Sequence, residues 1–143
     1  MLPIATTYAA QARVQTPPFE RVQLPNGAVV LLMERRDVPL ISVDARVLGG
    51  ARLDTKGHFG TADLLAGLLE KGADERDALA FAQTVASVGG ALSASASTEA
   101  ISVTGSFLSR DRQLMVELLA DMLQRPRFEE AELQTLRARR IEF

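Results

Sequence analysis

The 143-residue sequence contains no cysteine, no tryptophan and only one histidine. The absence of cysteine excludes disulfides, thiolate metal ligands and a cysteine nucleophile. Aromatic residues make up 5% of the chain, which argues against a surface on which nucleic-acid bases stack. Because 16 basic and 18 acidic residues nearly balance, the charge does not indicate nucleic acid or anionic lipid as a partner. No apolar run reaches the length of a transmembrane helix.

The length and the high aliphatic content indicate one domain with a substantial core. A chain of this size can remove about two-thirds of its unfolded surface from water. The sequence predicts a hairpin over residues 20–34, since its Asn26-Gly27 turn accepts positive φ. A third strand is expected over 39–48, where polar and apolar residues partly alternate. Two more strands are expected over 91–97 and 100–107.

Helical periodicity and capping residues predict the helices between these strands. The first helix runs from Thr61, its N-cap, to Lys71, and Gly72 ends it. The second begins at the cap Asp74 and ends at Gly89-Gly90. Its expected buried stripe consists of Ala78, Phe81, Ala82, Val85 and Val88.

Two further helices are predicted in the last third of the chain. One is capped by Ser109 and ends before Pro126, because the residue before a proline is steered away from helix. Its expected buried residues are Leu114, Leu118, Leu119 and Met122. The other begins at Glu129 and is still running at Phe143, with no stop signal.

One helical segment resembles a zinc motif from which the ligands are missing. Residues 60–73 read Gly-Thr-Ala-Asp-Leu-Leu-Ala-Gly-Leu-Leu-Glu-Lys-Gly-Ala. This segment resembles the signature of the pitrilysin/insulinase family of zinc peptidases, in which Gly-x-Ala leads into His-x-x-Glu-His and the helix closes on Lys-Gly-Thr. Here the first His position is Asp63, the Glu position is Ala66 and the second His position is Gly67.

The resemblance extends over about residues 19–143. Residues 24–27 resemble the Leu-x-Asn-Gly turn of the family's opening hairpin, and residues 49–54 occupy the place of its Gly-Ser-Arg-x-Glu turn. Residues 88–97 resemble its Gly-Gly-x-x-Asn-Ala-x-Thr-Ser strand, with Ser93 at the Asn position. The resemblance implies an α+β fold: a two-layer α/β sandwich of the processing-peptidase type, with a mostly antiparallel sheet and helices packed on one face.

The missing ligands decide what chemistry the segment can perform. Zinc hydrolysis needs imidazole ligands, an open position for water, and a carboxylate that takes the proton from this water. Asp63 offers one oxygen, but Gly67 has no side chain and Ala66 cannot act as a base. Glu70 lies on the same helical stripe as Asp63, where a solvated surface position is expected. The sequence therefore predicts no catalytic residue and no metal site, and no cofactor beyond zinc in an active partner.

Two other residues are candidate zinc ligands. The single histidine, His58, lies in the loop before the helix, where a surface position is expected and pairing with Asp63 is not. The family takes a third ligand, a Glu, from a later helix, at or just beyond Phe143 in this numbering. Glu142 is close to this place, but the resemblance does not identify it as the ligand.

The small-residue strand over 91–97 is a candidate peptide-binding edge. In active relatives the corresponding strand lies beside the cleft, and a substrate peptide pairs with it as an added strand. Ser93, Ala94 and Ser95 are the expected pairing residues, since main-chain hydrogen bonds do not depend on side-chain identity. Small residues also let a helix pack close to the sheet, and this alternative stays open.

The N-terminal segment suggests a location. Residues 2–12 are mildly apolar and end in Ala-Gln-Ala, the small-residue pattern of a signal-peptidase site. Residues 1–18 are thus expected to be a signal remnant or disordered lead-in, and residues 19–143 the N-terminal part of an inactive peptidase-like domain. The signal interpretation favours a periplasmic or secreted protein, and the lead-in interpretation a cytoplasmic one. Family subunits contain two such domains, each larger than this chain, so a truncated domain is expected.

Three functions are compatible with the resemblance. The first is a non-catalytic partner subunit that encloses and helps to bind peptide substrate for a homologous, active zinc peptidase. The second is an active zinc endopeptidase with altered ligands such as Asp63, Glu70 and His58. The third is a purely structural assembly subunit. The sequence favours the first over the second and does not separate it from the third.

Overall fold

The structure, a computed structural model, describes residues 17–141 of the chain, in two units that divide between Val38 and Pro39. In the first unit, strands β1 (Glu20–Gln23) and β2 (Val29–Leu32) form an antiparallel hairpin. Its turn places Gly27 at a φ of 86°, and the Asn26 side chain accepts a hydrogen bond from the Ala28 amide at 3.1 Å. The hairpin predicted over residues 20–34 is confirmed.

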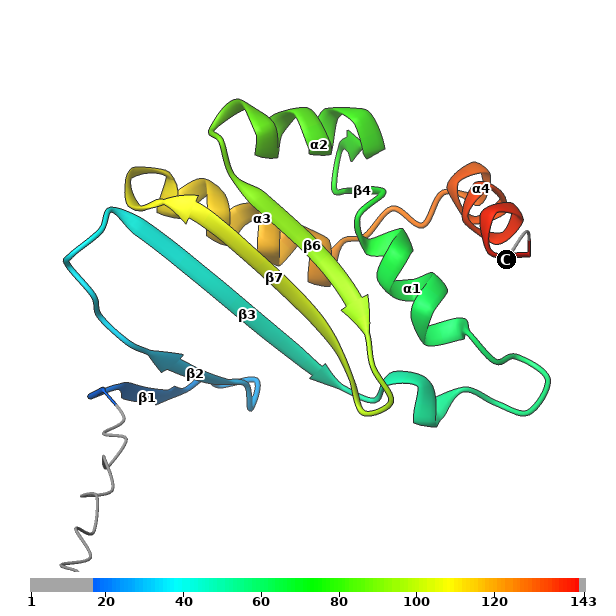
Figure 1. Ribbon diagram of the computed structural model, residues 1–143, viewed down its shortest axis with the longest axis horizontal. Coiled ribbons are helices and arrows are strands. Elements are labelled where there is room, and N and C mark those ends of the chain that lie inside the picture. The colour runs from blue at the N-terminus through cyan, green and yellow to red at the C-terminus, as the bar shows by residue number, and fades with distance from the viewer. Residues whose placement is uncertain (1–16, 142–143) are drawn as a thin grey trace, which may run out of the picture. The chain divides into compact units, whose positions relative to one another are not determined.

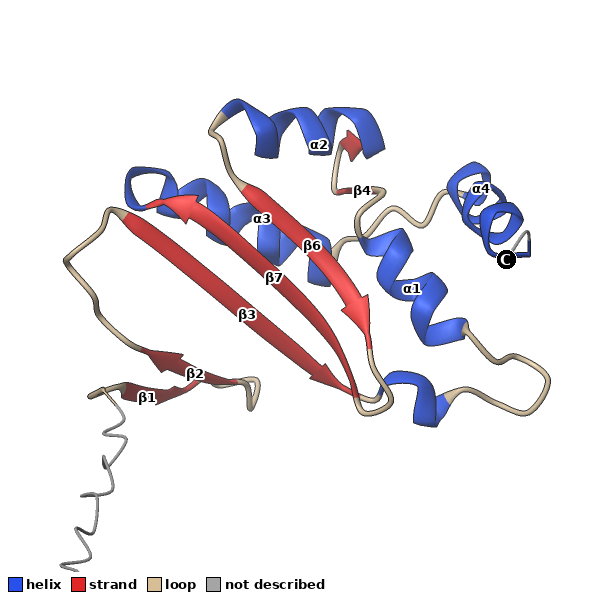
Figure 2. Ribbon diagram, viewed as in Figure 1, coloured by secondary structure: helices blue, strands red, loops and turns tan. Residues whose placement is uncertain are grey.

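The second unit contains the remaining elements (Figure 1). In chain order they are β3 (Leu40–Leu48), η1 (Gly50–Leu53), α1 (Thr61–Leu69), β4 (Gly72–Ala73), β5 (Arg76–Asp77), α2 (Ala78–Ser87), β6 (Ala91–Ala96), β7 (Ala100–Leu108), η2 (Ser109–Asp111), α3 (Arg112–Gln124) and α4 (Glu130–Ile141). Strands β3, β7 and β6 form an antiparallel sheet in that order, and β4 pairs with β5 in a small hairpin (Figure 2). The three longer strands match their predicted positions.

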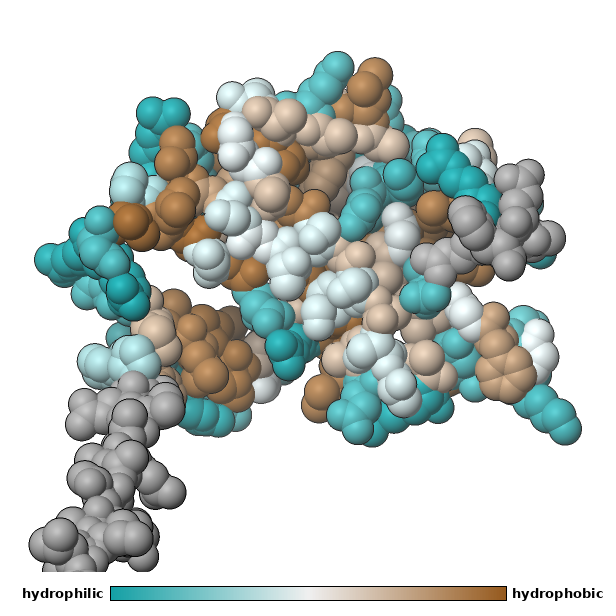
Figure 3. All heavy atoms as spheres, viewed as in Figure 1, coloured by the Kyte–Doolittle hydropathy of each residue, from teal (hydrophilic) through white to brown (hydrophobic). Residues whose placement is uncertain are grey.

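The main sheet has one apolar and one polar face. Along β3, Ile41 and Val43 are partly buried against the core, whereas Ser42 and Asp44 are exposed. The core combines this face with residues of α1, α2 and α3, so these helices pack on one side of the sheet, as the α+β sandwich prediction requires. Its most deeply buried members are Ala73, Val103, Phe107, Leu118 and Met122. Figure 3 shows pale, weakly polar side chains over the opposite face, near β6 and β7.

Helix α1 is positioned by a cap that the sequence did not indicate. Its N-cap is Gly60 rather than Thr61, and it ends at Leu69 rather than Lys71. The carboxylate of Asp54 accepts hydrogen bonds from the amides of Gly60 at 2.7 Å and Ala62 at 3.0 Å. This side chain satisfies donors at the start of the helix and complements its dipole from outside the helix.

The second helix starts later than predicted. Asp74 is not its cap, because residues 72–77 form the β4–β5 hairpin. The cap is Asp77, whose side chain accepts a hydrogen bond from the Ala80 amide at 2.8 Å. Phe81 and Val85 are buried as expected, but Ala82 is exposed. The buried stripe of α2 is therefore narrower than the predicted one.

The third and fourth helices differ from prediction at their starts. Ser109 caps neither η2 nor α3, since no side-chain cap hydrogen bond forms at either start. Leu118 and Met122 are fully buried, Leu114 and Leu119 only partly, and the buried Met115 and Asp121 were not predicted. Helix α3 ends before Pro126 as expected, and α4 begins at Glu130, one residue later than predicted.

Two predictions concern parts of the chain that the structure does not describe. The signal-like residues 2–12 and the possible third-ligand position Glu142 both lie outside residues 17–141. Within the described range, every helix is too short or too polar to cross a membrane.

Candidate functional site

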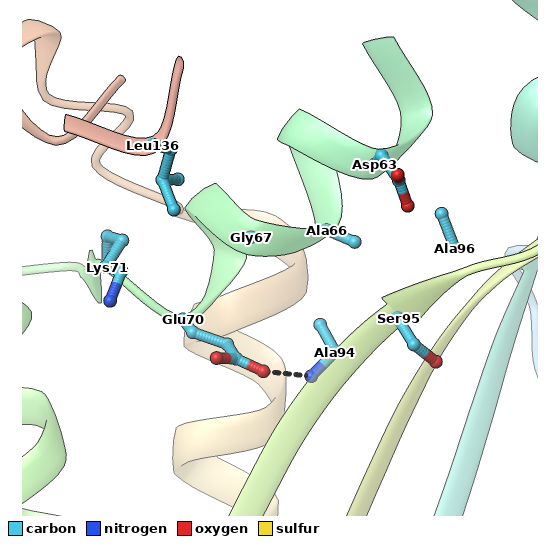
Figure 4. A pocket seen from close by; sticks show the side chains of 9 residues that line it. All are labelled: Asp63, Ala66, Gly67, Glu70, Lys71, Ala94, Ser95, Ala96 and Leu136. Atoms are coloured by element: carbon cyan, nitrogen blue, oxygen red, sulfur yellow. Dashed lines mark hydrogen bonds between the residues drawn. The ribbon is translucent and has the colours of Figure 1, made fainter. Parts of the chain in front are cut away.

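The degenerate motif faces a pocket between α1, β6 and α4. The pocket has a volume of about 340 Å³. Its lining residues, labelled in Figure 4, are Asp63, Ala66, Gly67, Glu70, Lys71, Ala94, Ser95, Ala96 and Leu136. The structure therefore brings all three motif positions to one cavity, together with the strand that was expected to pair with a peptide.

The three motif positions have different surroundings in this pocket. Asp63 is exposed and points toward the Ala96 end of β6 (Figure 4). Ala66 is 3% exposed and belongs to the hydrophobic core. At Gly67, an added Cβ would lie 3.3 Å from the Leu136 Cδ1 of α4. The space that a second histidine would need is therefore already lined by an apolar side chain.

These residues do not fit zinc. Among residues 17–141, no group of three or more histidine, aspartate and glutamate side chains is placed to hold a metal ion. His58 does not line the pocket, and its Nδ1 lies 3.3 Å from the Thr55 hydroxyl in the loop before α1. The imidazole ligands of a zinc peptidase are therefore missing from this pocket, and Ala66 provides no base for a metal-bound water.

Glu70 was expected to be a solvated surface residue, and this prediction is wrong. Its Oε1 accepts a hydrogen bond from the Ala94 amide of β6 at 2.6 Å, in a partly buried position (Figure 4). The contact joins the last turn of α1 to an edge of the sheet across 24 positions in sequence. The only signal for it in the sequence is that Glu70 shares a helical stripe with Asp63.

The predicted pairing residues of β6 lie in two environments. The Ser93 hydroxyl lies 3.2 Å from that of Thr104 on β7, on the exposed face of the sheet. Ala94 and Ser95 line the pocket. Within the described part of the chain, β6 pairs with β7 on one side and with no strand on the other. Its second edge, at the pocket, therefore has the backbone groups that an added strand requires.

A second polar cluster lies on the β4–β5 hairpin and α3. Asp121 is 1% exposed. Its carboxylate accepts hydrogen bonds from Arg76, at 3.0 Å, and from Arg125. Arg76 also donates to Glu117 at 2.6 Å, and Arg125 lies 3.2 Å from Asp74.

The arginines of this cluster stay charged. The hydrogen bond to Glu117, with the charge of Asp121 added, raises the pKa of Arg76 above its usual value. The hydrogen bond to Asp121 raises the pKa of Arg125. Since Asp121 has arginine donors on both oxygens, the cluster is a satisfied structural network, and no local pattern in the sequence indicates it.

Known proteins resemble this chain in both sequence and structure. Residues 29–142 match the model of the family described as "Insulinase (Peptidase family M16)". The chain is 30% identical to subunit 2 of the mitochondrial cytochrome b-c1 complex of Mus musculus, over 95% of this chain and 30% of that protein. It is 29% identical to a probable mitochondrial-processing peptidase subunit beta of Arabidopsis thaliana, over 85% of this chain and 23% of that protein. It is 27% identical to the non-peptidase homolog YmxG of Helicobacter pylori, over 78% of this chain and 26% of that protein.

Solved structures have the same fold. A peptidase M16 inactive domain from Pseudomonas fluorescens superimposes with a TM-score of 0.80 at 22% identity, over 85% of this chain and 30% of that one. A protease from Helicobacter pylori superimposes with a TM-score of 0.75 at 26% identity, over 88% of this chain and 30% of that one.

The names of these proteins include a protease and a peptidase subunit as well as an inactive domain and a non-peptidase homologue, so activity has to be judged from the site itself. The chain spans less than a third of the length of the relatives described here. Since the family model covers most of the sequence, the chain belongs to the insulinase family, peptidase family M16.

Proposed function

We propose that this chain is a non-catalytic member of the insulinase family that helps to enclose and bind peptide for a homologous, active zinc peptidase subunit. The observation that carries the proposal is the pocket at the motif. Asp63, Ala66 and Gly67 replace both imidazole ligands and the base, and no group of described side chains at the pocket is placed to hold a metal ion. Zinc is assigned to the active partner alone, and this chain requires no cofactor.

The side-chain packing around Ala66 and Gly67 also disfavours the catalytic groups at these two positions. Ala66 is part of the hydrophobic core, so the position of the catalytic carboxylate now contributes apolar contact. Leu136 lies against Gly67, where a second imidazole would have to enter. Reactivation would therefore require a change in packing as well as in the ligands.

The binding role rests on the backbone of β6. An extended peptide can add to an unpaired strand edge through main-chain hydrogen bonds, which need no particular side chains. The β6 edge at the pocket has no strand partner among the described residues, and its side chains at Ala94 and Ala96 are small. These features are retained although the catalytic groups are not.

The known relatives support this proposal. An inactive domain and a non-peptidase homologue show that the family retains members described as lacking peptidase activity. Two further relatives are named as subunits, which is consistent with a role inside an assembly. The Ala-x-Ala pattern at residues 10–12 supports a periplasmic or secreted location as part of this proposal, with a cytoplasmic one as the alternative.

Reconstitution tests the proposal. The chain is expressed alone and together with a homologous subunit that retains His-x-x-Glu-His, and each sample is assayed with a fluorogenic peptide library after size-exclusion chromatography. We expect no cleavage by the chain alone, co-elution with the active subunit, and faster cleavage by the pair than by the active subunit alone. Zinc-dependent cleavage by the isolated chain, or failure to co-elute, would contradict the proposal.

A structural assembly role is the second candidate. The 30% identity to subunit 2 of the cytochrome b-c1 complex favours it, because the name describes a component of a complex rather than a peptidase. In this case the chain would still co-elute with a partner, but it would not bind extended peptides at β6. Peptide titration therefore separates the two candidates.

A further inference from the structure

The pocket edge of β6 is already engaged by a side chain of the same molecule. In an antiparallel strand, the N–H and C=O groups of one residue point to the same side, and successive residues alternate between sides. Because the Ala94 amide donates to Glu70, the backbone groups of Ala94 point to the unpaired edge. Those of Leu92 and Ala96 point the same way by alternation, and Ala94 is the middle one of these three outward-facing residues.

Glu70 is held where an added strand would have to bind. A peptide pairing along β6 would place a carbonyl oxygen at the Ala94 amide, which is the position of the Glu70 Oε1, 2.6 Å from the nitrogen. Two oxygen acceptors cannot share this donor at full strength, and the negative carboxylate also repels a peptide carbonyl. Glu70 lines a pocket of about 340 Å³ together with the small residues Ala66, Gly67 and Ala94, which leaves room into which its side chain can move (Figure 4).

We propose that Glu70 is an internal competitor for the peptide-binding edge of β6. In the free chain its carboxylate occupies the central outward-facing amide, and a peptide binds in register with β6 only when Glu70 leaves Ala94. This inference rests on the proposed peptide-binding role and adds a residue that controls access to it. The ligand is an extended peptide segment recognised through its main chain.

The expected size of the effect follows from the bond that must be broken. A hydrogen bond to a charged acceptor contributes more than a neutral one, and removing this competing acceptor should strengthen peptide binding about tenfold or more. A glutamine retains an oxygen that can accept from Ala94 but has no charge, so its effect should be intermediate. The ranking of the alanine, glutamine and unaltered chains is therefore part of the inference.

The test is a peptide titration of the ¹⁵N-labelled 143-residue chain, followed by the amide resonances of Ala94 and Ala96. The probe is an octapeptide of alternating valine and threonine with a lysine at each end, which favours an extended conformation. The variants are Glu70→Ala and Glu70→Gln. The matched control is Glu75→Ala, which removes the same charge from an exposed position in the β4–β5 turn.

We expect Glu70→Ala to bind the octapeptide about tenfold more tightly than the unaltered chain, Glu70→Gln to lie between them, and Glu75→Ala to match the unaltered chain. Equal affinity of Glu70→Ala and the unaltered chain would overturn the competitor role and leave the peptide-binding proposal standing. Absence of binding by all four proteins would overturn both. If Glu70→Ala does not fold, the Glu70→Gln variant decides: affinity equal to that of the unaltered chain overturns the inference.

Discussion

Two polar regions of the second unit use their charged residues in opposite ways. On the β4–β5 hairpin and α3, the buried carboxylate of Asp121 is paired with Arg76 and Arg125. At the α1–β6 pocket, Asp63 is exposed, and Glu70 bonds to the backbone of a strand edge instead of to a cation. The charged groups of the first region pair with one another and connect the small hairpin to α3, whereas Glu70 connects α1 to the backbone of β6.

The two regions differ in how far the fold depends on their charged side chains. The position of the family's base now holds Ala66, which packs in the core, and that of a ligand holds Gly67, beside Leu136. The fold does not depend on charged side chains at these positions. The arginine–aspartate cluster, in contrast, joins the small hairpin to α3, and its loss should lower the stability of the whole unit.

The largest effect is expected at Asp121. The substitution Asp121→Ala leaves Arg76 and Arg125 without the buried carboxylate, and removing one partner of a buried ion pair is strongly destabilising. Since Arg125 is 60% exposed, the cost should fall at the low end of the range, about 3 kcal/mol of unfolding free energy. Urea denaturation followed by circular dichroism measures it.

The matched control is Glu117→Ala, on the same helix and bonded to the same Arg76. Glu117 is 48% exposed, so its loss should cost less than about 1 kcal/mol. Equal losses in the two variants would show that burial of Asp121 is not what distinguishes this cluster.

An intermediate effect is expected at the pocket if the family's carboxylate is restored. Ala66→Glu places a charge at a position that is 3% exposed and belongs to the hydrophobic core. We expect a loss of about 2 kcal/mol or more of unfolding free energy, measured by the same denaturation experiment. As a control, Gln83→Glu adds the same charge at an exposed position of α2 and should change stability by no more than about 0.5 kcal/mol. An Ala66→Glu variant as stable as this control would show that the pocket still accommodates a catalytic carboxylate.

The smallest effect is expected at Gly67. Alanine in the interior of α1 gains helix propensity worth up to about 1 kcal/mol, and the new Cβ meets only the end of the flexible Leu136 side chain, at 3.3 Å. Gly67→Ala should therefore be stabilising by about 0.5 kcal/mol in thermal denaturation. A clear loss of stability would indicate that the contact between α1 and α4 is too rigid to adjust, and that the glycine is needed for packing.

Much of the fold could be predicted from local patterns. The Asn26-Gly27 turn located the first hairpin, and the alternation along residues 39–48 located β3. The helix starts were less predictable, because α1 is capped by Asp54 from outside the helix. The β4–β5 hairpin has strands of two residues each, too short to show a period, and so Asp74 was mistaken for a cap.

The candidate site was predictable in its positions but not in its contacts. The resemblance identified Asp63, Ala66 and Gly67, and the structure places them together at one pocket. The bond between Glu70 and Ala94 joins residues 24 positions apart, and the one between Arg76 and Asp121 joins residues 45 positions apart. Such pairings depend on how the helices dock on the sheet, and no local sequence pattern contains this information.

The measurement that tests the central claim most directly is the zinc content of the purified, tag-free chain, expressed with zinc supplied and determined by elemental analysis. If replacement of the ligands has abolished the metal site, the chain should contain less than about a tenth of an equivalent of zinc, since a single carboxylate cannot replace the three or four ligands of a protein zinc site. One tightly held zinc ion per chain would contradict the account and favour an enzyme with altered ligands.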